Sequence, residues 1–228
     1  MNSTRCTAQS YTLTEQLSQK RNDLRTRVIS SDKLAVIDEE TERIARSGMV
    51  EKCLQVGDRV PDFSLLDTNG ETIDLQTLLA KGIVILSFYR GNWCPYCNLE
   101  LKALETIYQT VNALNASVVA VSPQSRKYSL SMREKKKLSF PVLSDPQNRI
   151  ARLFGIVHQV PEHLWHTYRE LQADFTQYNE HPALELPLPA TFIIRQEGTI
   201  AYSFIDADYT KRLDPVEIVS ILKQLNGT

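Results

Sequence analysis

The chain has 228 residues, a formal net charge of −1 and 42% hydrophobic residues, which is the composition of an ordinary globular protein. The balanced charge argues against a nucleic-acid or anionic-membrane surface, and no apolar run approaches the roughly 20 residues of a membrane helix. The N-terminus lacks the apolar core of a signal peptide, so we expect a cytoplasmic protein without nucleic-acid or membrane partners.

Residues 1–52 are predicted to form an N-terminal extension, made of a polar tail and a hairpin of two helices. Apolar residues from Leu13 to Val28 fall on one helical face, and those from Leu34 to Ile44 fall on another. Amphipathic helices need an apolar partner. The hairpin is therefore expected either to dock on the main domain or to join two copies of the chain as a homodimer.

Residues 53–228 are predicted to form the main domain, in which strands and helices alternate. The alternation over residues 117–154 indicates an α/β fold with parallel strands and right-handed crossovers, and residues 191–194 and 199–204 are predicted to form a hairpin. Residues 157–187 interrupt it as an irregular, partly helical insertion that we expect to form a wall beside the site. The predicted strands are 60–65, 83–89, 117–122, 140–143, 191–194 and 199–204. The predicted helices are 72–80, a long helix after the strand 83–89 whose apolar stripe runs over 101–114, and 125–138, 149–154 and 215–226.

A pair of cysteines lies between the buried strand 83–89 and the amphipathic helix that follows it. Residues 93–97 read Trp-Cys-Pro-Tyr-Cys. This arrangement puts Cys94 and Cys97 in the first helical turn, where free N–H groups and the helix dipole favour a thiolate. The two-residue gap lets the second thiol close a disulfide on the first. The pattern predicts a redox-active dithiol.

Two other interpretations of the cysteine pair are weaker. A zinc or iron–sulfur site needs about four ligands, and the remaining cysteines and histidines stand at no known metal spacing. A pair of inert buried cysteines would not require this strand–motif–helix arrangement. We therefore expect no metal and no cofactor.

The segment 88–100 resembles the active-site segment of peroxiredoxins. It is most similar to the peroxiredoxin-like branch of the alkyl hydroperoxide reductase/thiol-specific antioxidant family that carries Cys-x-x-Cys. Residues 56–63, 121–124, 140–145 and 189–194 also match this family. The resemblance implies a thioredoxin-like, peroxiredoxin-type mixed sheet with flanking helices, from near residue 53 to the C-terminus.

The family motif Pro-x-x-x-Thr-x-x-Cys can be laid on this chain residue by residue. The resemblance places the peroxide-attacking cysteine at Cys97, replaces the threonine by Cys94 and the proline by Arg90, and matches the usual following glutamate with Glu100. It implies that Cys97 attacks and Cys94 resolves. Helix geometry alone favours Cys94 as the more acidic sulfur, so the order of attack stays open.

The chain departs from the family pattern at the peroxide-binding arginine. That arginine would fall at Pro189, which instead resembles the cis-proline that thioredoxins place beside their dithiol. We expect Arg90 to supply the missing positive charge and Trp93 to shape and dry the pocket.

The resemblance implies a thiol-dependent peroxidase that reduces hydrogen peroxide or small organic hydroperoxides and is regenerated by thioredoxin or a similar dithiol. The alternative is a thioredoxin- or glutaredoxin-like protein disulfide oxidoreductase. A third possibility is a redox sensor whose helical hairpin engages a partner.

Overall fold

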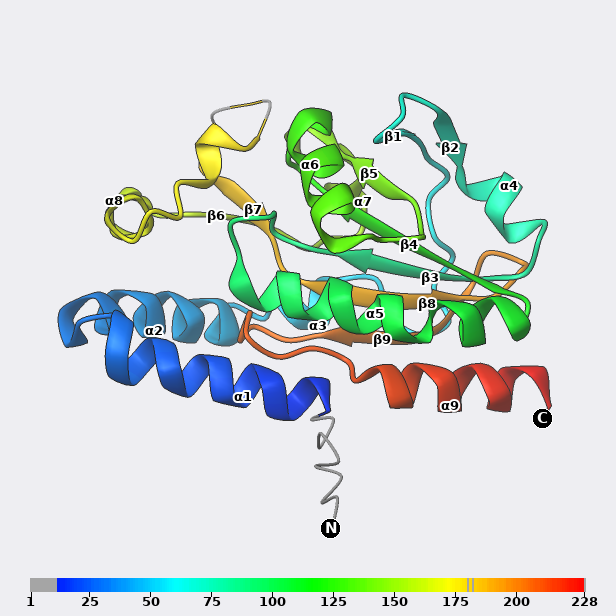
Figure 1. Cartoon of the computed structure of the whole chain (residues 1–228), viewed down its shortest axis with the longest axis horizontal. Helices are drawn as coiled ribbons and strands as arrows, with labels where there is room; N and C mark the ends of the chain where they lie inside the picture. Colours follow the sequence, from blue (N-terminus) through cyan, green and yellow to red (C-terminus); the bar gives the residue numbers. More distant parts are fainter. Residues whose placement is uncertain (1–11, 180, 182, 228) are drawn as a thin grey trace, which may run out of the picture.

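A computed structural model of the chain describes residues 12–179, 181 and 183–227. The predicted polar tail and its Cys6 lie outside this range. The described part is organised around one seven-stranded sheet with helices on both faces (Figure 1). No helix in these residues is both long and apolar enough to span a membrane.

The central sheet has the strand order β2-β1-β5-β4-β3-β8-β9. Its strands are β1 (Ser64–Asp67), β2 (Thr72–Asp74), β3 (Ile83–Phe88), β4 (Ala116–Ser122), β5 (Val142–Ser144), β8 (Ala190–Ile194) and β9 (Ile200–Ile205). Only the central trio β3, β4 and β5 is parallel, and all other neighbours are antiparallel. The sheet is therefore mixed, as the family resemblance implies, and not wholly parallel.

The helices follow the predicted order along the chain. They are α1 (Leu13–Asp23), the π-helical segment η1 (Leu24–Val28), α2 (Ser31–Arg46), α3 (Met49–Lys52), α4 (Leu75–Leu79), α5 (Pro95–Ala113), α6 (Arg126–Lys136), the 3₁₀ turn η2 (Pro146–Asn148), α7 (Arg149–Leu153) and α9 (Pro215–Asn226). The last helix begins as predicted, because the Asp214 side chain accepts a hydrogen bond from Val216 N at 3.1 Å.

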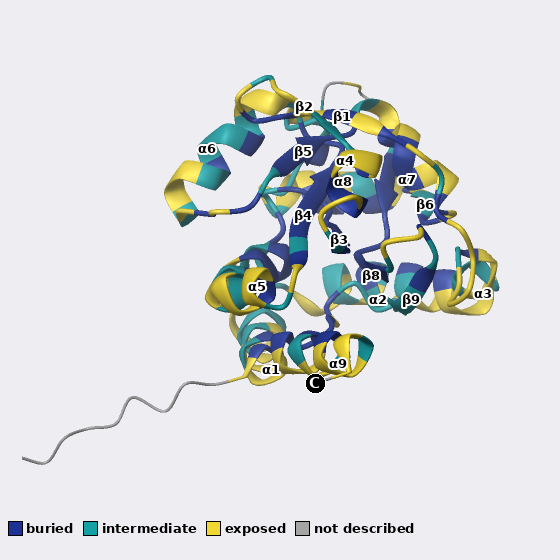
Figure 2. Cartoon of the chain, turned by 90° about the vertical axis from the view of Figure 1, so that its right-hand side faces the viewer, coloured by how far each residue is buried: buried dark blue, intermediate teal, exposed yellow. Residues whose placement is uncertain are grey.

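Strand β3 divides the core into two halves. All six of its residues are buried, and successive side chains point to opposite faces. Ile83 and Ile85 pack with α1, α5 and α9, whereas Val84, Leu86 and Phe88 pack with α4 and α7. Figure 2 shows the buried sheet between helices whose outer sides are exposed. The cysteine segment follows β3 directly, so it begins in the middle of the core.

Most predicted elements are shifted by one or two residues at a boundary, and two at the start of the main domain differ further. Residues 72–74 are the strand β2, not the start of a helix, because they pair with β1; α4 begins only after Asp74, whose side chain accepts from Thr77 N. The first sheet strand starts at Ser64 and not at residue 60. Pro61 has no N–H to give to a ladder, which explains the later start.

The insertion 157–187 has structure of its own. It contains β6 (Val157–Gln159), α8 (Glu162–Glu170), the 3₁₀ turn η3 (Phe175–Gln177) and β7 (Glu185–Pro187). β6 and β7 form a separate two-stranded antiparallel sheet. The insertion is less irregular than predicted.

The N-terminal extension docks on the rest of the chain. Leu13 and Leu17 of α1 are buried against the α5 side of the core, and α2 packs along α8 of the insertion. Figure 1 shows the blue helix α1 beside α5. Of the two docking modes left open by the sequence, the one within the chain is present. The domain boundary near residue 53 stays a prediction.

Candidate functional site

The cysteine pair lies at the start of α5, directly beyond the carboxyl end of β3. Cys94 is the N-cap, Pro95 is the first helical residue and Cys97 lies in the first turn. Both cysteines are free thiols, with 1% and 0% of their surface exposed. The first-turn placement is the one that the sequence predicts, and it puts both residues at the helix end where backbone N–H groups lack intrahelical partners.

The loop before the pair has a shape that only certain residues allow. Gly91 has φ +142°, and a Cβ there would lie 2.5 Å from Trp93 Nε1. The next residue, Asn92, donates its backbone N–H to the buried Gln124 side chain at 2.8 Å. These contacts fix the turn that carries Trp93 and Cys94 into the site.

A buried arginine contacts the second cysteine. Arg212 Nη2 lies 3.1 Å from Cys97 Sγ, and Arg212 Nε lies 2.5 Å from Glu100 Oε2. Its Nη1 donates to two backbone carbonyls at 2.6 Å, and Ser87 Oγ donates to the other Glu100 oxygen at 3.3 Å. Every nitrogen of the guanidinium has a partner, so its direction toward Cys97 is fixed.

A second buried arginine lies in a cage of aromatic rings. The Arg90 guanidinium carbon is 4.3 Å from the ring centre of Tyr209, 4.6 Å from that of Trp93 and 5.2 Å from that of Tyr168. Its Nη2 donates to the Tyr168 hydroxyl at 2.7 Å, and its backbone N–H points to Cys97 Sγ at 3.5 Å. Within the described residues, Arg90 has no carboxylate in salt-bridge contact.

The two thiols have pKa values shifted in opposite directions. Burial opposes ionisation of Cys94, but the hydrogen bond with Cys97 and the charges of Arg90 and Arg212 outweigh it and lower the pKa of Cys94 to about 6. Burial, then the hydrogen bond with Cys94 and its charge, raises the pKa of Cys97 well above the usual thiol value, against the opposing charge of Arg212. One proton is thus lost from the pair near neutral pH, and the charge lies on Cys94.

The buried acid beside the pair titrates close to neutrality. Burial raises the pKa of Glu100 to about 7, even though Arg212 acts in the opposite direction. Cys53 differs from the pair: burial raises the pKa of its thiol to about 11, and the thiol donates to two carbonyls at 3.3 Å. It has the properties of a structural cysteine.

A cavity of about 270 Å³ opens onto Cys94. Its wall includes Cys94, Arg90 and Trp93 but not Cys97. Tyr168 and three further residues of the insertion also line it, as the predicted wall beside the site requires. A small molecule that enters this cavity meets the Cys94 sulfur.

The structure brings together five of the six residues singled out from the sequence, namely Cys94, Cys97, Arg90, Trp93 and Glu100. Pro189 follows β7, and the pairing of Phe88 with Ala190 places it next to Tyr89, at the same edge of the sheet. The described residues contain no cis peptide bond, so the expected cis-proline is trans. Nor do the described residues bring three metal-ligating side chains together.

Sequence reasoning missed Arg212, Tyr168 and Tyr209. The family overlay places the sulfur-contacting arginine at position 189, whereas the structure supplies it from the loop before α9. Arg212 is 115 residues from Cys97 in sequence and belongs to no local motif. Arg212 stands two residues before Asp214, the N-cap of α9. This position in the sequence gives no indication of a contact with a cysteine.

Comparison with known proteins agrees with this geometry. Residues 56–203 match the model described as the AhpC/TSA family. The chain belongs to this family. It is 30% identical over 147 residues to the peroxiredoxin Bcp of Bacillus subtilis, across 64% of this chain and 82% of that relative. A Bcp relative of Haemophilus influenzae is 31% identical over 103 residues, which are 45% of this chain and 66% of that protein.

Solved structures confirm the predicted fold. The crystal structure of peroxidoxin BcpB from Mycobacterium tuberculosis superposes with a TM-score of 0.60 at 22% identity, covering 75% of this chain and 98% of that one. The PrxQ C47S mutant of Xylella fastidiosa gives 0.59 at 17% identity, covering 76% and 96%. The main domain is thus a thioredoxin-like fold of the peroxiredoxin type, and the whole N-terminal extension, residues 1–52, lies outside the family match at 56–203.

The charge arrangement makes a prediction about thiol acidity. Arg212→Met removes the cation nearest to Cys97 and one of two that stabilise the Cys94 thiolate. We expect the pH midpoint of alkylation by iodoacetamide to rise from about 6 toward about 8.5, the value of a free cysteine. Arg149→Met, at an exposed position away from the pair, is the matched control. An unchanged midpoint in Arg212→Met would refute the assigned role.

Proposed function

We propose that the chain is a thiol-dependent peroxidase that reduces hydrogen peroxide or small organic hydroperoxides through a Cys94–Cys97 dithiol–disulfide cycle. The observation that carries this proposal is the position of Cys94, which lines a small cavity beside the buried Arg90 and has a pKa lowered to about 6. Membership of a family whose relatives are peroxiredoxins supports the same reaction.

In the first step, the Cys94 thiolate attacks one oxygen of the hydroperoxide. The O–O bond breaks, the sulfur is oxidised to a sulfenic acid, and the other oxygen takes up a proton and leaves as water or an alcohol. Negative charge moves from sulfur to the leaving oxygen during this step. Arg90, buried beside the cavity and without a carboxylate in salt-bridge contact among the described residues, is placed to stabilise that charge.

In the second step, Cys97 attacks the oxidised sulfur of Cys94. A disulfide forms, and the Cys97 proton leaves with the sulfenic hydroxyl as water. Arg212 lies 3.1 Å from Cys97 Sγ and stabilises the negative charge that this sulfur must carry. Glu100 holds the guanidinium in that direction through the 2.5 Å contact. Glu100 is therefore a positioning residue.

The order of attack is the point at which the family overlay and the structure support different assignments. The overlay supports Cys97 as the attacking sulfur. The lower pKa of Cys94 and its place in the cavity wall support Cys94, with Cys97 as the resolving thiol. We propose the latter order.

A dithiol donor of the thioredoxin type then returns the disulfide to the thiols by exchange, so that the donor carries the oxidation away. We further propose a cytoplasmic location, in keeping with the absence of a membrane-spanning helix from the described residues. A homodimer through the N-terminal helices stays a prediction.

The alternative, a protein disulfide oxidoreductase, is not favoured. Its substrate would be a disulfide on another protein, whereas the cavity that Cys94 lines, of about 270 Å³, has the size for a small molecule. The family relatives are peroxiredoxins.

A substrate comparison tests the function. We expect stoichiometric hydrogen peroxide to convert the reduced protein to its Cys94–Cys97 disulfide within seconds, and we expect the reduced protein not to accelerate insulin reduction by dithiothreitol. Thiol titration follows the first reaction and insulin turbidity follows the second. Rapid insulin reduction with peroxide-resistant thiols would contradict the peroxidase and support the alternative.

Trapping with a sulfenic-acid reagent tests the order of attack. In Cys97→Ser, the resolving thiol is absent, and we expect hydrogen peroxide to leave a labelled sulfenic acid on Cys94 that mass spectrometry locates. In Cys94→Ser, label on Cys97 should form at least about tenfold more slowly, because the Cys97 thiol is fully buried and does not line the cavity. The reverse pattern would restore Cys97 as the attacking sulfur.

A further inference from the structure

The cavity at Cys94 is built by two parts of the chain. The main domain supplies the side with Cys94, Arg90 and the aromatic rings. The N-terminal extension, which lies outside the family match, supplies four aliphatic side chains on the other side: Leu24, Val28, Ile29 and Ile37. The chain's own addition to the family fold thus forms an apolar wall opposite the reacting sulfur.

The backbone of the extension changes where it meets the cavity. The α-helix α1 ends at Asp23 and continues as the π-helical segment η1, with Ile29 N donating to Leu24 O at 2.9 Å. Three of the four wall residues belong to this segment or follow it directly. Short π-helical segments are frequent at functional sites because they redirect side chains from a regular helix.

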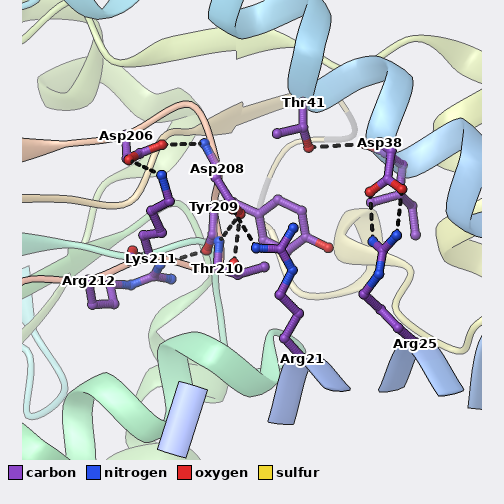
Figure 3. Close-up of polar contacts among 11 residues, drawn as sticks. Arg21, Arg25, Asp38, Thr41, Asp206, Asp208, Tyr209, Thr210, Lys211 and Arg212 are labelled. Carbon is purple, nitrogen blue, oxygen red and sulfur yellow. Dashed lines mark hydrogen bonds and ion pairs between the residues drawn. The ribbon is translucent and has the colours of Figure 1, made fainter. Parts of the chain in front are cut away.

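Ion pairs hold the wall against the loop that carries Tyr209 and Arg212. Arg21 Nη1 lies 2.9 Å from Asp208 Oδ2, as Figure 3 shows. Arg25 forms a two-pronged pair with Asp38, with both distances 2.8 Å. The first pair ties α1 to the loop, and the second ties η1 to α2. The wall therefore has a fixed position in the resting structure.

The chemistry of the cavity specifies its ligand. The only cationic side chain in its wall is Arg90, whose charge is balanced by the adjacent Cys94 thiolate. Apart from Gln172 and tyrosine hydroxyls, the rest of the wall is aliphatic or aromatic. An uncharged hydrocarbon group fits this environment better than an anion. The volume of about 270 Å³ lies just below the range of ordinary small-molecule sites, which excludes a whole phospholipid.

We propose that the N-terminal extension is a specificity element: its four aliphatic side chains receive the hydrocarbon group of a small, uncharged aryl or branched alkyl hydroperoxide. This inference rests on the proposed peroxidase function and names the substrate class that the cavity selects. Hydrogen peroxide has no hydrocarbon group and gains nothing from the wall. Selectivity between the two peroxides therefore reports on the extension.

The first test narrows the cavity at its exposed rim. The rate constants for single-turnover oxidation of the full chain by cumene hydroperoxide and by hydrogen peroxide are measured by tryptophan fluorescence. Val28→Trp should lower the ratio of the cumene to the hydrogen peroxide constant by about tenfold. Val56→Trp is the matched control, because Val56 is 60% exposed, Val28 is 64% exposed, and Val56 does not line the cavity. Its ratio should equal that of the wild type.

A second pair of variants removes wall contacts from inside. Ile37 and Ile44 lie on the same helix and are 6% and 5% exposed, but only Ile37 lines the cavity. Ile37→Ala should lower the ratio of the cumene hydroperoxide to the hydrogen peroxide rate constant. Ile44→Ala should lower the free energy of unfolding to a similar extent but leave that ratio unchanged.

The possible outcomes separate the two proposals. An unchanged ratio in both Val28→Trp and Ile37→Ala, or an equal change in their controls, would overturn the specificity element while leaving the peroxidase intact. A wild-type protein that neither peroxide oxidises would overturn the peroxidase itself.

Discussion

The site depends on an excess of buried positive charge. Two guanidinium groups, Arg90 and Arg212, are almost completely removed from water, yet only one carboxylate, Glu100, pairs with them among the described residues. Burying an unbalanced cation costs several kcal/mol. A thiolate on the adjacent pair supplies the missing negative charge, so burial of the arginines and acidity of Cys94 are two aspects of one interaction. The aromatic cage of Arg90 and the backbone partners of Arg212 hold both cations in place.

Much of the fold follows from local sequence, and much of the site does not. The mostly apolar strand 83–88 and the helix that begins at Pro95 are set by patterns within about 30 residues, so the position of both cysteines was predictable. Arg212 was not, because its contact with Cys97 spans 115 residues and depends on how the loop before α9 folds back. The family overlay assigned the position of that arginine to residue 189. An overlay of sequences assigns positions along the chain, and it cannot show that a residue elsewhere in the chain makes the same contact. The parallel centre of β3, β4 and β5 was predictable from the alternation of strand and helix, and the antiparallel pair β8 and β9 from the turn between them.

The N-terminal extension lines the cavity through which a substrate reaches Cys94. Its amphipathic faces showed that it needed an apolar partner but not which one, because the same stripe can dock on its own domain or on another chain. In the structure it closes one side of the cavity that Cys94 lines, and both cysteines are almost completely buried. A small peroxide can reach Cys94 through the cavity, whereas a protein reductant needs the wall to move or the disulfide to become exposed after oxidation. The position of the wall therefore separates the two half-reactions by the size of the molecule that must reach Cys94.

The most direct test of the central claim is the titration of the two thiols themselves. With cysteine Cβ carbons labelled with ¹³C, nuclear magnetic resonance follows the ionisation of Cys94 and Cys97 separately in the reduced protein. The account predicts that Cys94 titrates near pH 6 and that Cys97 keeps its proton to far higher pH. If both carbons instead titrated together near the ordinary thiol value of about 8.5, the buried arginines would not control the dithiol and the proposed mechanism would be contradicted.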